Sequence, residues 1–284
     1  MAVLLWKGIV MARVAVRGVE LDYDLIGREA PTFVWGHGLS SSRAREDEFG
    51  ILEWARFNGA GRLLRYDARG HGQSGFTIEP LSYAWDELAR DQLGLLDAIG
   101  VSGYVAGGAS MGCGTALHAA LLAPHRVEAL VLVVPPTGWE TRRERAEIWG
   151  QVASLIENDG IEAFITAMQS MPNPDPLFGR DEWNTLFASS ARRSEPSRLA
   201  GVFRGAGTAD LPDREAIRSI TVPTLILAWT GDPGHPASTA EQLHELLPSS
   251  EVSFASTWDE FRSWTHRANA FIQSLKIRTP QPRH

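Results

Sequence analysis

The sequence G-A-S-M-G at residues 108–112 constrains the fold of this chain more than any other stretch. It follows a short apolar run at residues 104–107, and residues 111–123 carry an apolar stripe at helical spacing. A strand that turns sharply into a helix holds the central side chain clear of the sheet, in a strained conformation. The pattern therefore predicts a strand–turn–helix unit with Ser110 at the turn. There Ser110 would attack a carbonyl as a nucleophile; the alternative is a glycine-rich loop with an incidental serine.

Composition and charge narrow the class of protein. A chain of 284 residues can bury the core of one large α/β domain, and 21% charged with 44% hydrophobic residues is typical of a globular protein. The net charge of −7 favours neither nucleic acid nor an anionic membrane as a partner. The lone Cys113 excludes an internal disulfide and a cysteine metal cluster. We expect a cytoplasmic protein that needs no metal and no organic cofactor.

The first ten residues differ from the rest of the chain. Residues 1–10 are apolar but contain one lysine, have no small-residue cleavage site and are too short to span a bilayer. Residues 12–16, just after Met11, have the pattern of a strand. We therefore expect residues 1–10 to be dispensable and Met11 to be the natural start.

Short apolar runs alternate with helical patterns along the chain. Residues 13–16 and 20–25 indicate two strands joined as a hairpin. Further strands are expected at residues 32–35, 62–66, 104–107, 129–134, 224–228 and 252–255, and helices at residues 88–99, 111–123 and 259–275. Such alternation favours a mostly parallel sheet covered on both faces. We therefore expect an α/β fold with an eight-stranded sheet.

Between the sixth and seventh strands the pattern becomes helical only. Helices are indicated at residues 144–157, 161–168 and 180–189, with three prolines within residues 172–176. Because ligands bind at the carboxyl ends of the strands in open α/β sheets, this segment suits a helical cap over that edge. The expected domains are a core of residues 1–135 and 219–284 and a cap of residues 136–218.

Four motifs carry a family resemblance. They are His37-Gly38 after the third strand, D-A-R-G-H-G-Q-S at residues 67–74, the turn at Ser110, and Asp232 after a late strand. Together they resemble the α/β-hydrolase fold family over nearly the whole chain. Residues 62–134 are most similar to the branch of 3-oxoadipate enol-lactonases and small-ester hydrolases. The resemblance implies hydrolysis of a carboxylic ester or lactone.

The resemblance also implies roles for individual positions. Ser110 would be the nucleophile, and the backbone N–H groups of Leu39 and Met111 would stabilise the oxyanion. Asp232, in the sequence T-G-D-P, matches the acid of the family. A serine nucleophile argues against the dehalogenase and epoxide-hydrolase branches, which attack with aspartate.

The chain departs from the family at the catalytic histidine, which the family carries after the last strand. Residues 255–261 occupy that place and contain no histidine, and a serine hydroxyl is a weak nucleophile without a base. His235, three residues after Asp232, is the tentative base, with a structural or substrate-contacting role as the alternative. The other histidines are expected to shape loops, pack or lie on the surface: His37, His71, His118, His125, His244, His266 and His284.

The start of the cap offers two aromatic candidates for the substrate site. Trp139 and Trp149 would line an apolar pocket, with core packing as the equal alternative. We interpret the chain as a serine hydrolase that acts on a small-molecule ester or lactone through an acyl-enzyme on Ser110. Because the base is unassigned, we expect weak activity. The alternatives are another serine-dependent reaction of this fold (a C–C hydrolase, perhydrolase or lyase) and a weak or inactive member that binds a small ligand.

Overall fold

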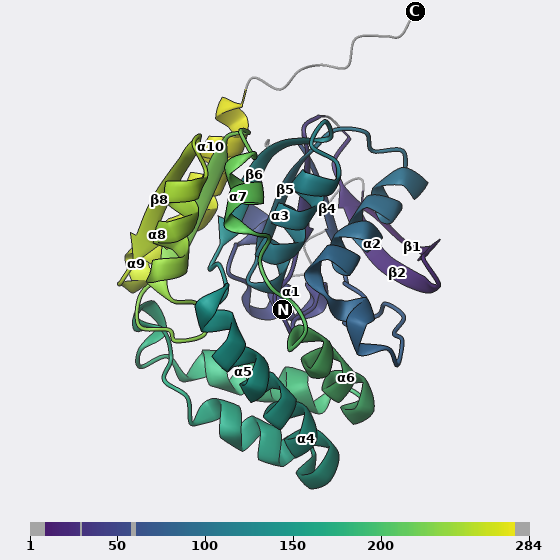
Figure 1. Ribbon diagram of the computed structural model, residues 1–284, viewed down its shortest axis with the longest axis vertical. Helices are drawn as coiled ribbons and strands as arrows, with labels where there is room; N and C mark the ends of the chain where they lie inside the picture. Colours follow the sequence, from purple (N-terminus) through teal and green to yellow (C-terminus); the bar gives the residue numbers. More distant parts are fainter. Residues whose placement is uncertain (1–8, 29, 58–60, 276–284) are drawn as a thin grey trace, which may run out of the picture.

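The computed structural model describes residues 9–28, 30–57 and 61–275, and its centre is a single eight-stranded sheet (Figure 1). The strands are β1 (Ile9–Val16), β2 (Val19–Ile26), β3 (Thr32–Gly36), β4 (Arg62–Tyr66), β5 (Tyr104–Ala109), β6 (Val127–Val133), β7 (Thr224–Trp229) and β8 (Ser250–Ala255). Their order in space is β1-β2-β4-β3-β5-β6-β7-β8. β2 is antiparallel to β1 and β4, and every other neighbouring pair is parallel. The mostly parallel sheet expected from the sequence is confirmed.

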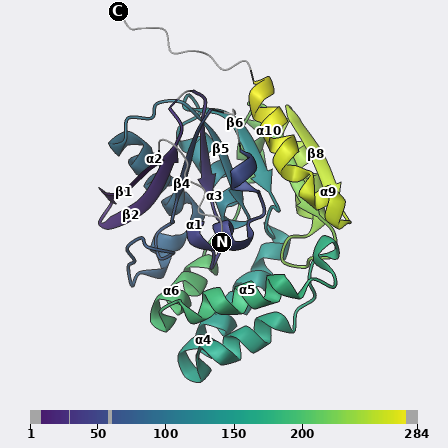
Figure 2. The same ribbon diagram turned by 180° about the vertical axis from the view of Figure 1, so that it is seen from behind.

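Helices cover both faces of this sheet. They are α1 (Arg43–Phe49), α2 (Trp85–Ala98), α3 (Met111–Leu122), α4 (Glu140–Gln169), α5 (Asp181–Arg192), α6 (Pro196–Ala206), α7 (Arg214–Arg218), α8 (Ala237–Leu246), α9 (Trp258–Arg262) and α10 (Trp264–Ser274), with short 3₁₀ turns η1 (Trp54–Arg56), η2 (Pro80–Tyr83) and η3 (Asp175–Leu177). One core packs α2, α3, α7 and α8 against the sheet, and the other packs η1, α9 and α10. Figures 1 and 2 show these two layers from opposite sides.

The strands are apolar on both sides because both sides are covered. In β3, Val34 belongs to one core, whereas its neighbours Phe33 and Trp35 belong to the other. The same division separates Ala106 from Val105 in β5. Side chains on both sides of these central strands are therefore buried.

The helices α4, α5 and α6 lie between β6 and β7 in the sequence and gather beyond one end of the sheet (Figures 1 and 2). They share an apolar cluster of their own, which includes Ile156, Phe164 and Phe203. α4 runs across the two expected helices with a kink at Gly160, where φ is 83°. α6 was not expected from the sequence.

The ends of the described chain differ from expectation. β1 begins at Ile9, and it pairs Ile9 with Ile26 and Val10 with Leu25, so part of the segment expected to be dispensable belongs to the sheet. Residues 1–8 lie outside the described residues. The single expected final helix is divided at Ser263 into α9 and α10. None of the described helices is long and apolar enough to cross a lipid bilayer.

Candidate active site

Ser110 occupies the sharp turn between β5 and α3. Its backbone has φ 51° and ψ −109°, a strained conformation for a residue with a side chain. The flanking glycines are required by close packing: a Cβ at Gly112 would lie 2.0 Å from the carbonyl oxygen of Gly36, and one at Gly108 would lie 2.4 Å from the Gly112 carbonyl carbon. The turn thus holds the Ser110 side chain at the carboxyl end of β5, where it lines a cavity.

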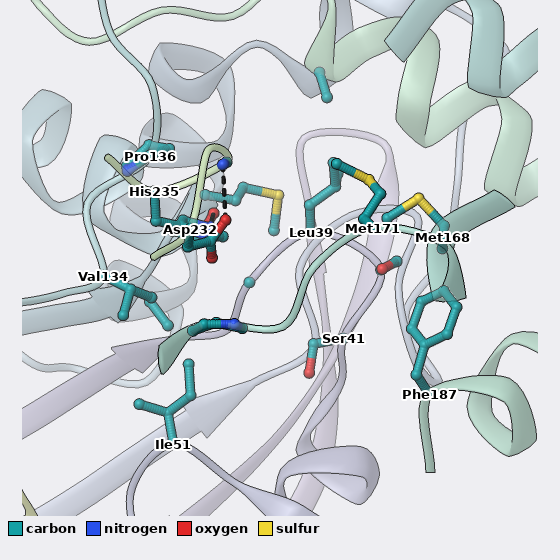
Figure 3. A pocket seen from close by; sticks show the side chains of 18 of the residues that line it. Leu39, Ser41, Ile51, Val134, Pro136, Met168, Met171, Phe187, Asp232 and His235 are labelled. Carbon is teal, nitrogen blue, oxygen red and sulfur yellow. Dashed lines mark hydrogen bonds and ion pairs between the residues drawn. The ribbon is translucent and has the colours of Figure 1, made fainter. Parts of the chain in front are cut away.

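Ser110 is joined to two side chains of the loop after β7. The Oγ of Ser110 lies 2.8 Å from Nε2 of His235, and Nδ1 of His235 lies 2.7 Å from Oδ2 of Asp232. Figure 3 shows Asp232 and His235 side by side at one side of the cavity. The structure therefore brings a hydroxyl, an imidazole and a carboxylate into one hydrogen-bonded chain. His235, tentative in the sequence, occupies the position that a general base would need.

The short spacing of Asp232 and His235 follows from a tight turn. The sequence D-P-G-H places proline second and glycine third, and the N–H of His235 donates to the carbonyl oxygen of Asp232 at 3.2 Å. The Asp232 side chain also accepts a 2.7 Å hydrogen bond from the N–H of Gly234, as aspartate commonly does at the start of a turn. The turn folds residue 235 back beside residue 232.

The carboxylate of Asp232 is held in its ionised form. Burial alone would raise its pKa, but the charge and the hydrogen bond of His235, together with the N–H donors of Gly234 and Trp229, lower the pKa to about 2. The Trp229 Nε1–H donates to Oδ2 at 3.0 Å. An ionised Asp232 accepts the Nδ1–H of His235, and this leaves Nε2 free to accept the Ser110 proton.

Two backbone N–H groups beside Ser110 have no acceptor within the described residues. Leu39 and Met111 both line the cavity, and neither N–H donates to another described group. Met111 is the first residue of α3, where N–H groups lack an intrahelical partner. These are the two positions implied by the family resemblance, and they leave two donors available to a ligand oxygen.

The loop after β8 contains no histidine, and its side chains cap a helix. The Thr257 hydroxyl and the Glu260 carboxylate form a capping box that begins α9. Glu260 also accepts from the N–H of Ser256 at 2.8 Å. This loop therefore provides the start of a helix, at the place where the family carries its histidine.

The remaining histidines serve other purposes. His37 accepts a 3.0 Å hydrogen bond from the N–H of Ala68, and the ring of His71 packs 4.9 Å from that of His37. Burial lowers the pKa of His37, and burial lowers that of His71 to about 3, so both rings are neutral. His118 contacts the carbonyl oxygen of Asp210, three others are exposed (His125, His244, His266), and His284 lies outside the described residues.

The cavity beside Ser110 has a volume of about 250 Å³ and a mainly apolar wall. The inserted helices and the segment between them contribute Trp149 to this wall. They also contribute Met168, Met171 and Phe187 (Figure 3). Trp139 lies elsewhere: its Nε1–H donates to the carbonyl oxygen of Pro212 at 3.0 Å, and its ring is packed against the sheet core. Of the two tryptophans predicted to line the pocket, only Trp149 does so.

The cavity also contains charged side chains that the sequence analysis did not single out. Arg45, Glu46, Arg142 and Arg145 all line it. An i, i+3 pair of arginines at residues 142 and 145 is the only signal in the sequence, and exposed helices carry many such pairs. Within the described residues, no group of three or more His, Cys, Asp or Glu could hold a metal ion.

Comparison with known proteins identifies one family. A family model described as "alpha/beta hydrolase fold" matches residues 37–266. The 3-oxoadipate enol-lactonase 1 of Acinetobacter baylyi is 27% identical over 272 residues, which cover 92% of this chain and 96% of the relative. The sn-1-specific diacylglycerol lipase ABHD11 of mouse is 30% identical over 196 residues, 68% of this chain and 54% of the relative.

Solved structures agree on the fold. The enol-lactonase from Burkholderia xenovorans LB400 superposes with a TM-score of 0.76 at 24% identity, covering 93% of this chain and 97% of that structure. A thermophilic esterase from Thermogutta terrifontis superposes with a TM-score of 0.73 at 20% identity, with the same coverage. At this identity the likeness concerns the fold alone.

Proposed function

This chain belongs to the α/β-hydrolase fold family, and on that basis we propose that it is a serine hydrolase of carboxylic esters or lactones. The observation that carries the proposal is the hydrogen-bonded chain from Ser110 through His235 to Asp232, with distances of 2.8 and 2.7 Å. A hydroxyl becomes a competent nucleophile when a base within hydrogen-bond reach accepts its proton. The enol-lactonase relative, similar over most of both chains, supports a lactone or ester as substrate.

The first half of the proposed reaction forms an acyl-enzyme. The Oγ of Ser110 attacks the substrate carbonyl carbon while its proton moves to Nε2 of His235. The carbonyl oxygen becomes an oxyanion, which the N–H groups of Leu39 and Met111 stabilise. When the C–O bond to the alcohol breaks, His235 donates its proton to the leaving oxygen.

The second half releases the acid. A water molecule gives a proton to His235 and attacks the acyl carbon, and the protonated His235 then returns the proton to the Oγ of Ser110. Asp232 remains ionised throughout and stabilises the positive imidazolium that exists during each half. Nucleophile, base and acid are all side chains, so the proposed reaction needs no metal and no organic cofactor.

The catalytic role of His235 also bears on the alternatives. The main support for weak activity, and for the alternative of a ligand-binding role, is the lack of a base after the last strand. A base in contact with Ser110 supports an active hydrolase instead. The inserted helices act in this proposal as a cap, since they supply much of the cavity wall.

Labelling with a fluorophosphonate tests the proposal directly, because this reagent reacts with a serine that a neighbouring base activates. We expect one adduct, on the peptide that contains Ser110, and none in Ser110→Ala or His235→Ala. Ser256→Ala, in the loop after β8, is the matched control and should label like the wild type. Wild-type protein that resists labelling while it remains folded would refute the proposed function.

A further inference from the structure

Two buried arginines, one helical turn apart on α4, have very different surroundings. Arg142 donates to the carbonyl oxygens of Ala206 and Ala209, and its guanidinium stacks 4.3 Å from the ring of Trp85. It ties α4 to the end of α6. Arg145 is 6% exposed, and its side chain makes no hydrogen bond or ion pair to any described residue. Its guanidinium lies 5.3 Å from the Trp149 ring and faces the cavity.

Arg45 of α1 is a second buried guanidinium of the same kind. It is 8% exposed, lines the cavity, and its side chain has no hydrogen-bond or ion-pair partner among the residues the structure describes. The rings of Trp183 and Phe187 lie 5.7 and 5.2 Å away. Burial lowers its pKa to about 10, which leaves it charged at neutral pH.

Among the described residues, no acid that lines the cavity forms an ion pair with either cation. The carboxylate of Asp232 accepts hydrogen bonds from His235, Trp229 and Gly234. Burial raises the pKa of Glu46 to about 8, so its carboxyl group is largely protonated at neutral pH, and it accepts from the Nε1–H of Trp35. The cavity therefore presents two unpaired guanidinium groups of described residues among apolar walls. Burying an unpaired charge is unfavourable, and a guanidinium binds a carboxylate through two parallel hydrogen bonds.

Resting on the proposed hydrolase function, we propose that the substrate is an ester or lactone that carries a carboxylate, which Arg145 binds. Arg145 is the better placed of the two arginines, because its Nη2 would lie 3.6 Å from a Cβ built on Gly234, next to the base. A single guanidinium matches a singly charged carboxylate better than a phosphate dianion. Arg45 adds positive potential at another part of the wall, beside α5.

A different role for Arg145 must be distinguished from this one. Burial lowers the pKa of Arg145 and the charge of Asp232 raises it, so the alternative is that Arg145 merely supports the catalytic carboxylate. Such a positioning residue would change kcat for neutral and anionic substrates alike. A residue that binds the substrate carboxylate changes KM for the anionic substrate and leaves the neutral one nearly unaffected.

The test compares monomethyl and dimethyl esters of the dicarboxylic acids from malonate to adipate, by methanol release. We expect at least one monomethyl ester to exceed its dimethyl partner about tenfold or more in kcat/KM, a preference that Arg145→Gln abolishes mainly through KM. Arg145→Lys should restore part of it, because lysine keeps the charge but not the planar fork. Arg143→Gln is the matched control, since Arg143 is exposed on the same helix and its loss changes the net charge equally.

Calorimetric binding to Ser110→Ala separates this inference from the proposed function. The monomethyl esters should bind this inactive variant more tightly than the dimethyl esters, and Arg145→Gln in the same background should remove the difference. Equal affinity for every pair would overturn the inference even in an active hydrolase. Loss of the preference in Arg45→Gln but not in Arg145→Gln would overturn the assignment of the carboxylate to Arg145.

Discussion

Asp232 and His235 lie three residues apart on one loop, and a 2.7 Å hydrogen bond between Oδ2 and Nδ1 joins them. In the family arrangement described above, the base is carried after the last strand. Here the turn D-P-G-H supplies acid and base together, and the loop after β8 caps a helix instead. The proposed catalytic chain therefore depends on two segments, the turn at Ser110 and the loop after β7.

His235→Ala should reduce ester turnover as severely as Ser110→Ala. A general base commonly contributes on the order of 10²–10⁴ in rate, and the two residues act as a unit, so the double variant should be no worse than either single one. Steady-state hydrolysis of short p-nitrophenyl esters measures the effect. His266→Ala, exposed on α10, is the control and should be silent. Turnover unchanged in His235→Ala would show that another group takes the proton.

Glu46→Gln should change how stability depends on pH. Burial raises the pKa of Glu46 to about 8, whereas the unfolded chain releases this proton near its ordinary value of about 4.3. Between these values the unfolded state binds fewer protons, so the free energy of unfolding falls as pH rises and levels off above pH 8. Glutamine cannot ionise and still offers Trp35 an acceptor.

Denaturant unfolding at pH 5, 6.5 and 8 measures this difference. The wild type should lose on the order of a few kcal/mol more than Glu46→Gln across this range, since each pH unit contributes up to about 1.4 kcal/mol. Glu48→Gln removes a carboxylate from an exposed site of the same helix and serves as the control. Parallel pH curves for the wild type and Glu46→Gln would contradict the raised pKa.

Gly231→Ala should disturb the loop after β7 that carries Asp232 and His235. Gly231 has φ 78°, and a Cβ there would lie 2.2 Å from Oδ1 of Asp175 in the segment that follows α4. We expect a loss of roughly 1–3 kcal/mol in stability together with a fall in kcat, because the loop must shift to relieve the clash. Gly160→Ala has a similar φ of 83° with no atom near its Cβ. Gly160→Ala should therefore lose stability and keep the kcat of the wild type. If Gly231→Ala and Gly160→Ala have equal kcat, the loop after β7 is not rigid.

Thr257→Ala should affect stability without affecting catalysis. Removal of a capping threonine costs about 0.5–2 kcal/mol, and this one begins α9 together with Glu260. Thermal unfolding should show the loss, while kcat/KM for a p-nitrophenyl ester should remain that of the wild type. If Thr257→Ala instead lowers kcat strongly and leaves stability unchanged, the loop after β8 takes part in catalysis.

The sheet and the turn at Ser110 could be predicted because each rests on local patterns. Apolar runs of five or six residues between turns mark central strands, and the small residues around Ser110 are required by backbone contacts within 3 Å. The role expected of Asp232 rests on the family resemblance, which its place after a late strand carries. The helix α6 also has local signals, with Pro196 in its first turn and buried Leu199, Val202 and Phe203 at helical spacing, but the sequence analysis missed them. The apolar pattern of residues 259–275 does not mark the division at Ser263.

The pairing of His235 with Ser110 could be suspected from the sequence, but only the fold establishes it. The turn signal D-P-G-H places residues 232 and 235 together, and the tertiary structure then directs that turn toward β5. The sequence likewise does not distinguish Arg142 from Arg145. Both are arginines of α4, and both are buried. One is bound by backbone carbonyl groups and the other is not, because the end of α6 meets the helix at one of the two positions.

All three residues of the proposed catalytic chain precede residue 236, so the last strand and the helices α8, α9 and α10 contribute no side chain to it. If the proposal holds, the part of the α/β core after residue 236 contributes to the site through packing, as Phe261 and Trp264 do beside Trp229, and not through a reacting group. Insertions or altered lengths after β8, which would displace a base carried there, leave the Asp232–His235 distance intact. The turn D-P-G-H is the sensitive place, because deletion of one residue there would separate Asp232 from His235 and His235 from Ser110.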